Sequence, residues 1–207
     1  MVRRTSPRGA ERRQHLIAAA GELVMEQGFG AVSHRAVAQR AGLPLAATTY
    51  YFASLEDLLA EAVGDLADSW LAAARGVLDA LPEHLDGPRA VAEAVLHVAA
   101  LVPGGSTGTD LGALLSLYER YVESARHEGL RPLIAAYDAG IDGLLVDVLR
   151  RSGAPASPDA ARLLLAVADG ALLRALAEGR PPGSAVDAVE GVVRLLSAQG
   201  QDTAGER

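Results

Sequence analysis

The sequence predicts an all-α protein, and three observations lead to that prediction. Hydrophobic residues make up 50% of the 207 residues and aromatic residues only 4%, so the apolar content is mainly Ala, Leu and Val. Ala and Leu are strong helix formers, and no stretch alternates apolar and polar residues as a strand does. Glycine, proline and serine divide the chain into about nine helical segments, enough for a small domain followed by a larger one.

The first helix is predicted to run from Gly9 to Gln27, and Gly28 ends it. Its apolar side chains recur at helical spacing, which marks the face that packs on the core. These residues are Leu16, Ile17, Ala20, Leu23 and Val24.

Two short helices follow. Ser33 is a good N-cap for the second helix, because its hydroxyl accepts a hydrogen bond from an unpaired backbone N–H, and Gly42 ends that helix. The third helix spans 44–51, with Pro44 at its first position. Two short helices joined by a glycine-containing turn form a helix-turn-helix unit, so residues 1–53 are predicted to be a three-helix domain.

Longer helices form a predicted second domain, residues 54–198. Ser54–Asp57 is a capping box for a fourth helix that reaches Leu81 and is expected to loosen at its glycines. Residues 103–108 form a loop, and the polar tail 199–207 is expected to be disordered. The five later helices are predicted at 88–102, 110–127, 132–152, 158–178 and 184–198.

The net charge of −7 is unevenly distributed. Residues 1–52 carry seven Arg and three acidic residues, whereas residues 53–207 carry 12 Arg and 23 acidic residues. Attraction to phosphates acts over a Debye length of ~8 Å, so a basic N-terminal domain can bind DNA on an otherwise acidic protein. Ordinary solvated arginines are the alternative explanation of this asymmetry.

The most informative segment, residues 28–58, reads Gly-Phe-Gly-Ala-Val-Ser-His-Arg-Ala-Val-Ala-Gln-Arg-Ala-Gly-Leu-Pro-Leu-Ala-Ala-Thr-Thr-Tyr-Tyr-Phe-Ala-Ser-Leu-Glu-Asp-Leu. Over roughly residues 10–60, the chain resembles the DNA-binding domain of the TetR family of repressors. The C-terminal part resembles that family only in the number and length of its helices. The resemblance implies a homodimeric repressor that binds double-stranded operator DNA and is released by a small-molecule effector.

The third helix has the side chains that a recognition helix needs. A helix that enters a major groove about 12 Å wide needs a slim outward face or groups that form hydrogen bonds. We expect Leu45 and the alanine methyls to touch thymine methyl groups, and the hydroxyls to donate to phosphates. The candidate contacts are Leu45, Ala46, Ala47, Thr49, Tyr50 and Tyr51.

The resemblance adds contacts from the start of the second helix, at Ser33, His34 and Arg35. Arg35 is the best candidate for a guanine, because arginine can bind O6 and N7 together. The N-terminal Arg3, Arg4 and Arg8 are expected to follow phosphates or an adjacent minor groove.

Alternative roles remain for these residues. Ser33 is expected to cap its helix, either with a phosphate contact in addition or as a cap alone. His34 also fits an ordinary surface position. Thr48 and Phe52 are expected in the core.

The sequence also departs from the family pattern. Ala53 and Leu55 stand where the family often has a lysine, and Leu45 stands where it often has a polar residue. Without the lysine, we expect one or more phosphate contacts to be missing or to come from the arginine-rich N-terminus. Leu45 predicts that base reading is more apolar here.

The eighth and ninth helices are apolar on more than one side, unlike an amphipathic surface helix. A second copy related by a two-fold axis is the commonest cover for such a surface, and two half-sites add specificity. Packing inside a monomer is the alternative. The expected dimer contacts are Leu165, Leu172, Leu176, Val189, Val193 and Leu196.

Larger or polar residues within the apolar helices are candidates for the effector pocket that the resemblance implies. They favour an apolar or amphipathic small molecule. Two of these candidates have alternative roles. His97 also fits an ordinary core or surface position, and Asp169 also fits a structural contact with another helix. The candidate residues are Trp70, His97, Leu114, Tyr118, Tyr121, Tyr137 and Asp169.

The sequence argues against an enzyme. The five histidines lack a metal-binding spacing, there is no cysteine, and neither a GxSxG nor a phosphate-binding glycine motif occurs. We expect no cofactor. A helical adaptor would leave the basic N-terminus unexplained, and transcriptional activation remains an alternative to repression. No apolar run approaches the ~20 residues of a membrane span, so we expect a cytoplasmic protein without membrane contact.

Overall fold

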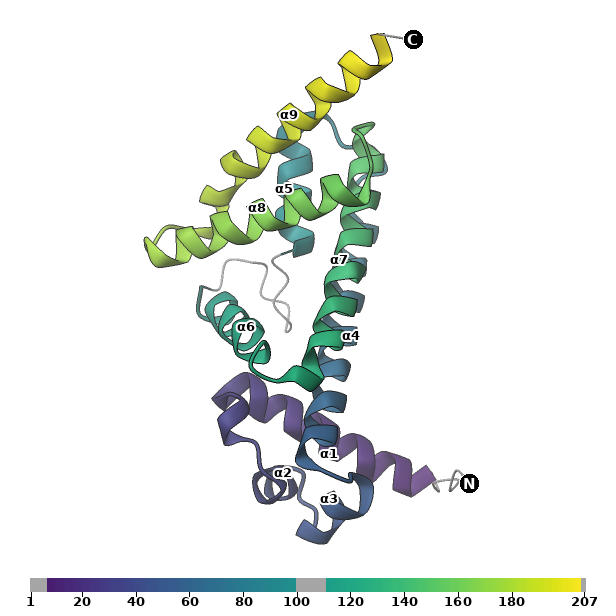
Figure 1. Ribbon diagram of the computed structural model, residues 1–207, viewed down its shortest axis with the longest axis vertical. Helices are drawn as coiled ribbons and strands as arrows, with labels where there is room; N and C mark the ends of the chain where they lie inside the picture. Colours follow the sequence, from purple (N-terminus) through teal and green to yellow (C-terminus); the bar gives the residue numbers. More distant parts are fainter. Residues whose placement is uncertain (1–6, 100–110, 206–207) are drawn as a thin grey trace. The chain divides into compact units, whose positions relative to one another are not determined.

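The computed structural model describes residues 7–99 and 111–205, and all regular structure in that part of the chain is helical. The prediction of an all-α fold with nine α-helices is confirmed there (Figure 1). The α-helices are α1 Pro7–Gln27, α2 His34–Arg40, α3 Leu45–Tyr51, α4 Leu55–Ala80, α5 Gly87–Ala99, α6 Leu111–Ser124, α7 Arg131–Ser152, α8 Pro158–Ala177 and α9 Val186–Gly205. Three short 3-10 helices join them: η1 Phe29–Ala31, η2 Glu128–Leu130 and η3 Pro182–Ala185.

The described residues form two compact units. Unit 1 contains the chain up to Asp68 together with Ser116–Ala135, and unit 2 contains Ser69–Leu115 and the chain from Ala136 onwards. Unit 1 therefore takes in the first half of α4 and most of α6, in addition to residues 1–53.

The core of unit 1 forms where α1, α2, the end of α3 and the start of α4 meet. The buried face of α1 has the predicted helical spacing, and Val37 from α2 and Phe52 pack with it. Leu16, Ala20, Val37 and Leu58 are at most 1% exposed. Burial of such side chains holds the short helices in place, because seven-residue helices are not stable by themselves.

Local hydrogen bonds begin and end the short helices. Ser33 Oγ accepts from the Ala36 N–H at 3.1 Å, which confirms the predicted N-cap of α2. Gly42 turns the chain with a φ of +64°. Pro44 was predicted to be the first helical residue of α3, but it is the N-cap of that helix, because its ψ of 145° is extended.

The fourth helix begins as the sequence predicts but is more regular. The Asp57 N–H donates to Ser54 Oγ at 3.0 Å and the Ser54 N–H donates to Asp57 Oδ2 at 3.1 Å, a reciprocal capping box. The predicted loosening at Gly64 and Gly76 is wrong, since α4 is continuous through both. A helical glycine costs about 1 kcal/mol, less than neighbouring buried side chains contribute.

Two other predicted boundaries are wrong. Helix α6 ends at Ser124 instead of His127, because Ser124 Oγ donates to the Tyr121 carbonyl and the next N–H groups bond three residues back. Helix α9 continues to Gly205, past the predicted end at Ala198, since no proline interrupts it. The loop 103–108 and the end of the helix predicted at 88–102 lie outside the described residues.

Unit 2 is built on the packing of α5, α8 and α9 (Figure 1). Arg151 of α7 donates to the carbonyls of Leu78 at 2.7 Å and Leu81 at 2.9 Å, so it satisfies groups left open at the end of α4. The ends of α4 and α7 are thereby fixed to each other.

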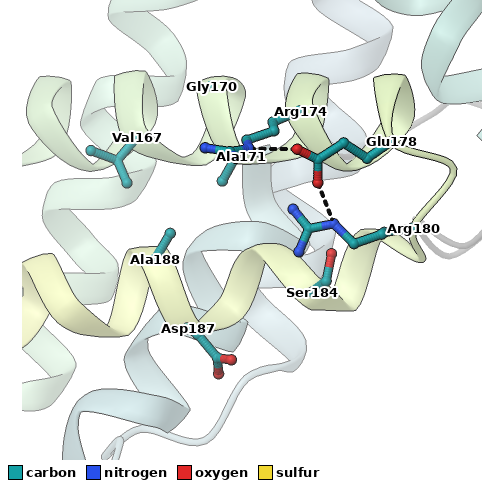
Figure 2. A pocket seen from close by; sticks show the side chains of 9 residues that line it. All are labelled: Val167, Gly170, Ala171, Arg174, Glu178, Arg180, Ser184, Asp187 and Ala188. Atoms are coloured by element: carbon teal, nitrogen blue, oxygen red, sulfur yellow. Dashed lines mark hydrogen bonds and ion pairs between the residues drawn. The ribbon is translucent and has the colours of Figure 1, made fainter.

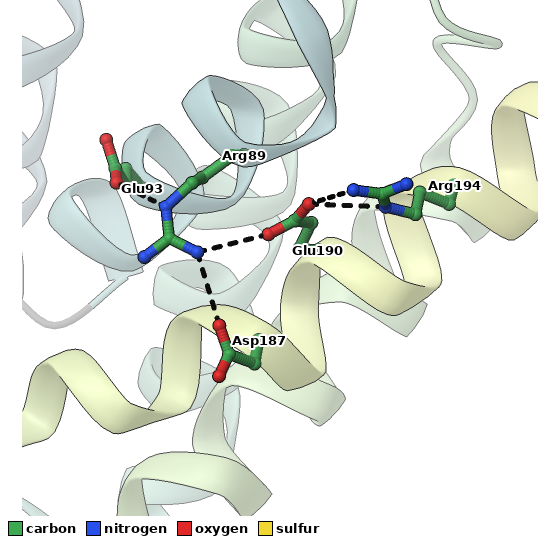
Figure 3. Close-up of polar contacts among 5 residues, drawn as sticks. All are labelled: Arg89, Glu93, Asp187, Glu190 and Arg194. Carbon is green, nitrogen blue, oxygen red and sulfur yellow. Dashed lines mark hydrogen bonds and ion pairs between the residues drawn. The ribbon is translucent and has the colours of Figure 1, made fainter.

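An ion-pair network joins α5 to α9 on the surface of unit 2. Arg89 lies between Glu93 of its own helix and the carboxylates of Asp187 and Glu190, at 3.2 and 3.3 Å, and Glu190 also pairs with Arg194 (Figure 3). The hydrogen bond with Asp187 raises the pKa of Arg89. Arg89, Asp187 and Arg194 are largely exposed, whereas Glu190 is only 13% exposed, so the two arginines neutralise a half-buried carboxylate between α5 and α9.

Candidate DNA-binding surface and effector site

The start of α2 presents the first candidate DNA contacts. Ser33 and Arg35 are exposed, and His34 is half-buried. The Ser33 hydroxyl is used as the cap, although its oxygen retains a second lone pair. His34 Nδ1 is buried without a hydrogen-bond partner among the described residues. Arg35 is therefore the exposed cation at this end of α2.

Helix α3 presents a largely apolar outer face. Leu45 is 53% exposed and Tyr50 67% exposed, and Ala46 and Thr49 are exposed beside them. Of the predicted contacts, Ala47 and Tyr51 are half-buried. The four outward residues share one side of the helix because Leu45 and Thr49, and likewise Ala46 and Tyr50, are four positions apart, and the two rows are adjacent.

Thr48 and Phe52 belong to the core, as the sequence predicts. Both are at most 4% exposed, and Thr48 Oγ1 donates to the Leu45 carbonyl at 2.8 Å. The guanidinium of Arg13 lies 5.0 Å from the centre of the Phe52 ring and pairs with Glu61. This cation–π contact supports the end of α3 from beneath.

Ion pairs hold α2 against α1. Arg40 at the end of α2 binds Glu22 at 3.2 Å and Glu26 at 2.7 Å. The hydrogen bond from Arg40 lowers the pKa of Glu26. The recognition unit therefore rests on α1 through apolar packing and through this exposed bridge.

Gly28 lies close to the side chain of Arg120, a contact that the sequence did not reveal. Its φ of +86° and ψ of 171° are accessible in practice only to glycine. A Cβ added there would lie 2.2 Å from Arg120 Nη1 of α6, and the adjacent Phe29 ring stacks on His127 at 4.8 Å. The connection before α2 is therefore in contact with α6 within unit 1.

We expect Gly28→Ala to lower the melting temperature by roughly 5–10 °C, because the backbone strain of about 1–3 kcal/mol adds to the clash with Arg120. Thermal unfolding followed by circular dichroism measures this change. Gly30→Ala is the matched control, since nothing lies within 4 Å of its added Cβ. Equal melting temperatures for the two variants would contradict the prediction.

Five of the seven predicted effector residues lie in unit 2, and three of them, on α4, α7 and α8, interact with one another. The rings of Trp70 and Tyr137 meet edge to face with centres 6.0 Å apart. Burial, together with smaller contributions from the negative charges of Asp138 and Asp169, raises the pKa of Tyr137 to about 12. Trp70 Nε1 is buried and has no hydrogen-bond partner among the described residues. Trp70 and Tyr137 therefore form an aromatic pair, and the negative charges of Asp138 and Asp169 act on it.

The other predicted effector residues have different surroundings. His97 is exposed on α5, and Leu114 is fully buried. Tyr118 is half-buried and Tyr121 is 39% exposed, both in the part of α6 that belongs to unit 1.

The predicted dimer contacts divide into two groups. Leu172, Val189 and Val193 are at most 1% exposed, so they pack inside their own chain instead of facing outwards. Leu165, Leu176 and Leu196 are half-buried. The large apolar side chains exposed on the described part of α8 and α9 are Leu163, Leu173 and Leu195, at 47, 43 and 66%. Helical periodicity identified the apolar helices but not which apolar side is turned outwards.

An open pocket of about 610 Å³ lies between α8 and α9 (Figure 2). Its lining includes the small residues Gly170, Ala171 and Ala188. At its rim Glu178 lies between Arg174 and Arg180, each 2.7 Å away, and the hydrogen bond from Arg174 lowers the pKa of Glu178. The sequence did not single out these rim residues.

The described residues contain no cluster of His, Cys, Asp or Glu that could hold a metal ion. No helix among them is long and apolar enough to cross a bilayer.

Comparisons with known proteins identify the family. The family described as "Bacterial regulatory proteins, tetR family" matches residues 16–62. The one described as "Tetracyclin repressor-like, C-terminal domain" matches residues 86–198, more than half of the chain. No curated protein sequence matches.

Several solved structures are similar over nearly the whole chain. The multidrug binding protein EbrR in complex with malachite green is 34% identical, with a TM-score of 0.64 over 90% of this chain and 98% of EbrR. A TetR-family member, SCO1917 of Streptomyces coelicolor A3, is 34% identical with a TM-score of 0.61 over 90% and 98%. The transcriptional regulator SCO7518 of Streptomyces coelicolor A3(2) is 29% identical with a TM-score of 0.67 over 90% and 99%. The chain belongs to the TetR family of DNA-binding transcriptional regulators, which are not enzymes.

Proposed function

We propose that this regulator is a homodimeric, cytoplasmic repressor that leaves its operator when a small organic cation binds in unit 2. The exposed face of α3, held on α1 and α4 by a buried core, is the observation that carries the proposal. Residues 1–53 act as the reading domain and residues 54–198 as the effector and dimer domain.

Dimerisation is supported by the outer face of α8 and α9. This face combines exposed Leu173 and Leu195 with small residues in a shallow pocket, where a helix of a second copy can approach closely. The charged rim of that pocket carries both signs, which a two-fold axis can pair. A two-fold dimer presents two α3 helices to half-sites spaced by about 34 Å or a multiple of it, so a small change in their separation weakens binding.

The class of effector is supported by the relatives and by the aromatic site. Structures of EbrR contain ethidium, proflavin or malachite green, all aromatic cations. In this chain Trp70 and Tyr137 offer aromatic faces and edges, and Asp138 and Asp169 supply the negative potential. A cation that enters such a site gains both cation–π and charge attraction. To release DNA it must bind the non-binding conformation more tightly.

We expect Asp169→Asn to weaken ethidium binding on the order of 10-fold, as for an ionic contribution of about 1.4 kcal/mol. The increase of ethidium fluorescence on binding measures the affinity. Asp159→Asn is the matched control, because it removes the same charge from α8 at a side chain that is 93% exposed. An equal effect of the two variants would point to the overall charge of unit 2 and not to the aromatic site.

The whole proposal is tested by selecting bound DNA from a random pool with the full chain, with and without ethidium. We expect enrichment of an inverted repeat and its loss with the cation. A helical adaptor protein would enrich no sequence. A reporter gene placed behind the selected operator then separates repression from activation, since a repressor lowers its expression.

A further inference from the structure

The outer face of α3 has an unusual chemistry for a recognition helix. Its exposed residues form two rows along the helix, Leu45 with Thr49 and Ala46 with Tyr50. Thr49 Oγ1 donates to the Ala46 carbonyl at 3.3 Å, so the proton of its hydroxyl is used within the helix. No amide or guanidinium group lies on this helix.

Among the exposed α3 side chains, Tyr50 therefore carries the hydroxyl that remains available. Its ring meets that of Tyr51 edge to face at 4.9 Å, which restrains where that hydroxyl can reach. The residues nearer the start of α3 offer only methyl and methylene groups. In a helix-turn-helix the N-terminal residues of the recognition helix are the ones that contact base edges.

The major groove has one apolar feature, the C5-methyl group of thymine. The other bases present hydrogen-bond donors and acceptors, and covering one of these with a leucine leaves it unsatisfied at a cost. Leu45 is 53% exposed at the first position of α3, directly after the extended Pro44.

We propose that α3 selects its half-site through thymine methyl groups, with Leu45 as the principal specificity-determining residue. Hydrogen-bonded base reading then falls to Arg35 at the start of α2, so each half-site combines a guanine with one or more thymines. This inference rests on the proposed sequence-specific binding, and it concerns only how the sequence is read.

The test uses the operator obtained by selection, with uracil replacing one thymine at a time. Uracil keeps the pairing and the groove hydrogen bonds of thymine but lacks the methyl group. For the unmodified protein we expect binding to weaken about fourfold at the thymine that Leu45 contacts, as for the loss of one buried methyl, and to stay unchanged elsewhere.

Leu45→Ala completes a double-mutant cycle, because alanine is a good helix former and Leu45 lies outside the core. We expect this variant to keep its melting temperature and to bind thymine and uracil operators equally at that position. Tyr50→Phe is the control that keeps the sensitivity to uracil.

Equal binding of all uracil operators by the unmodified protein would overturn the methyl-reading proposal while leaving specific binding intact. A uracil effect that persists in Leu45→Ala would overturn the assignment to Leu45. Failure to enrich any sequence would overturn the proposed function itself.

Discussion

Replacing Leu195 with glutamate is expected to convert the dimer into monomers and to weaken operator binding by roughly 10²–10⁴-fold. Leu195 is 66% exposed on α9, so the substitution leaves the core of a single chain unchanged. In a two-fold dimer each substitution places two new charges in one interface, where they are desolvated and unpaired. A monomer contacts one half-site and loses the gain from linking two readers.

Light scattering and fluorescence anisotropy with labelled operator measure the two parts of this prediction. Val122→Glu is the matched control, because Val122 is 63% exposed on α6 and outside the α8–α9 face. It should stay dimeric and bind operator normally. A Leu195→Glu protein that remains dimeric would show that the interface lies elsewhere on the chain.

Features set by neighbouring residues could be predicted from the sequence. The caps at Ser33 and Ser54 depend on side chains that reach backbone groups three residues away, so the pattern of residue types is enough to locate them. The burial of Thr48 was expected from the resemblance to the family, in which this position usually carries an apolar residue that faces inwards.

Features set by distant residues could not be predicted. Gly28 looks like a simple helix end in the sequence, yet the guanidinium of Arg120, 92 positions further along the chain, occupies the space that a Cβ would need. Val189 and Val193 were expected at the dimer interface, but they are buried in their own chain, where α5 packs against α9. Periodicity tells which residues share a face, and only the packing of the other helices tells whether that face is covered.

The same limit applies to the effector site. Seven residues were chosen from the sequence as candidates for the effector pocket, because they are larger or polar residues within apolar helices. In unit 2, the packing of α4 against α7 joins Trp70 and Tyr137, and the charge of Asp169 acts on Tyr137. His97 has the appropriate chemistry but is turned to the surface of α5. Residue type gave the chemistry of the site, and the tertiary structure determines which candidates come together.

Arg35→Ala is expected to weaken specific operator binding by about 1–3 kcal/mol, or roughly 5- to 150-fold. Arg35 is exposed at the second position of α2, and no acidic residue is recorded as its partner among the described residues, whereas Arg40 of the same helix is bound by Glu22 and Glu26. Its guanidinium is therefore free to form two hydrogen bonds with one guanine.

The conservative variant Arg35→Lys separates base reading from simple charge. Lysine keeps the positive charge but not the planar pair of donors. If Arg35 reads a guanine, the lysine variant should lose preference for that base while its salt dependence stays close to that of the unmodified protein. If it contacts only phosphate, the alanine variant should weaken binding to all sequences alike and reduce the salt slope by about 1. An unchanged footprint and affinity in Arg35→Ala would exclude both roles, and base recognition would then depend on the methyl contacts of α3 alone.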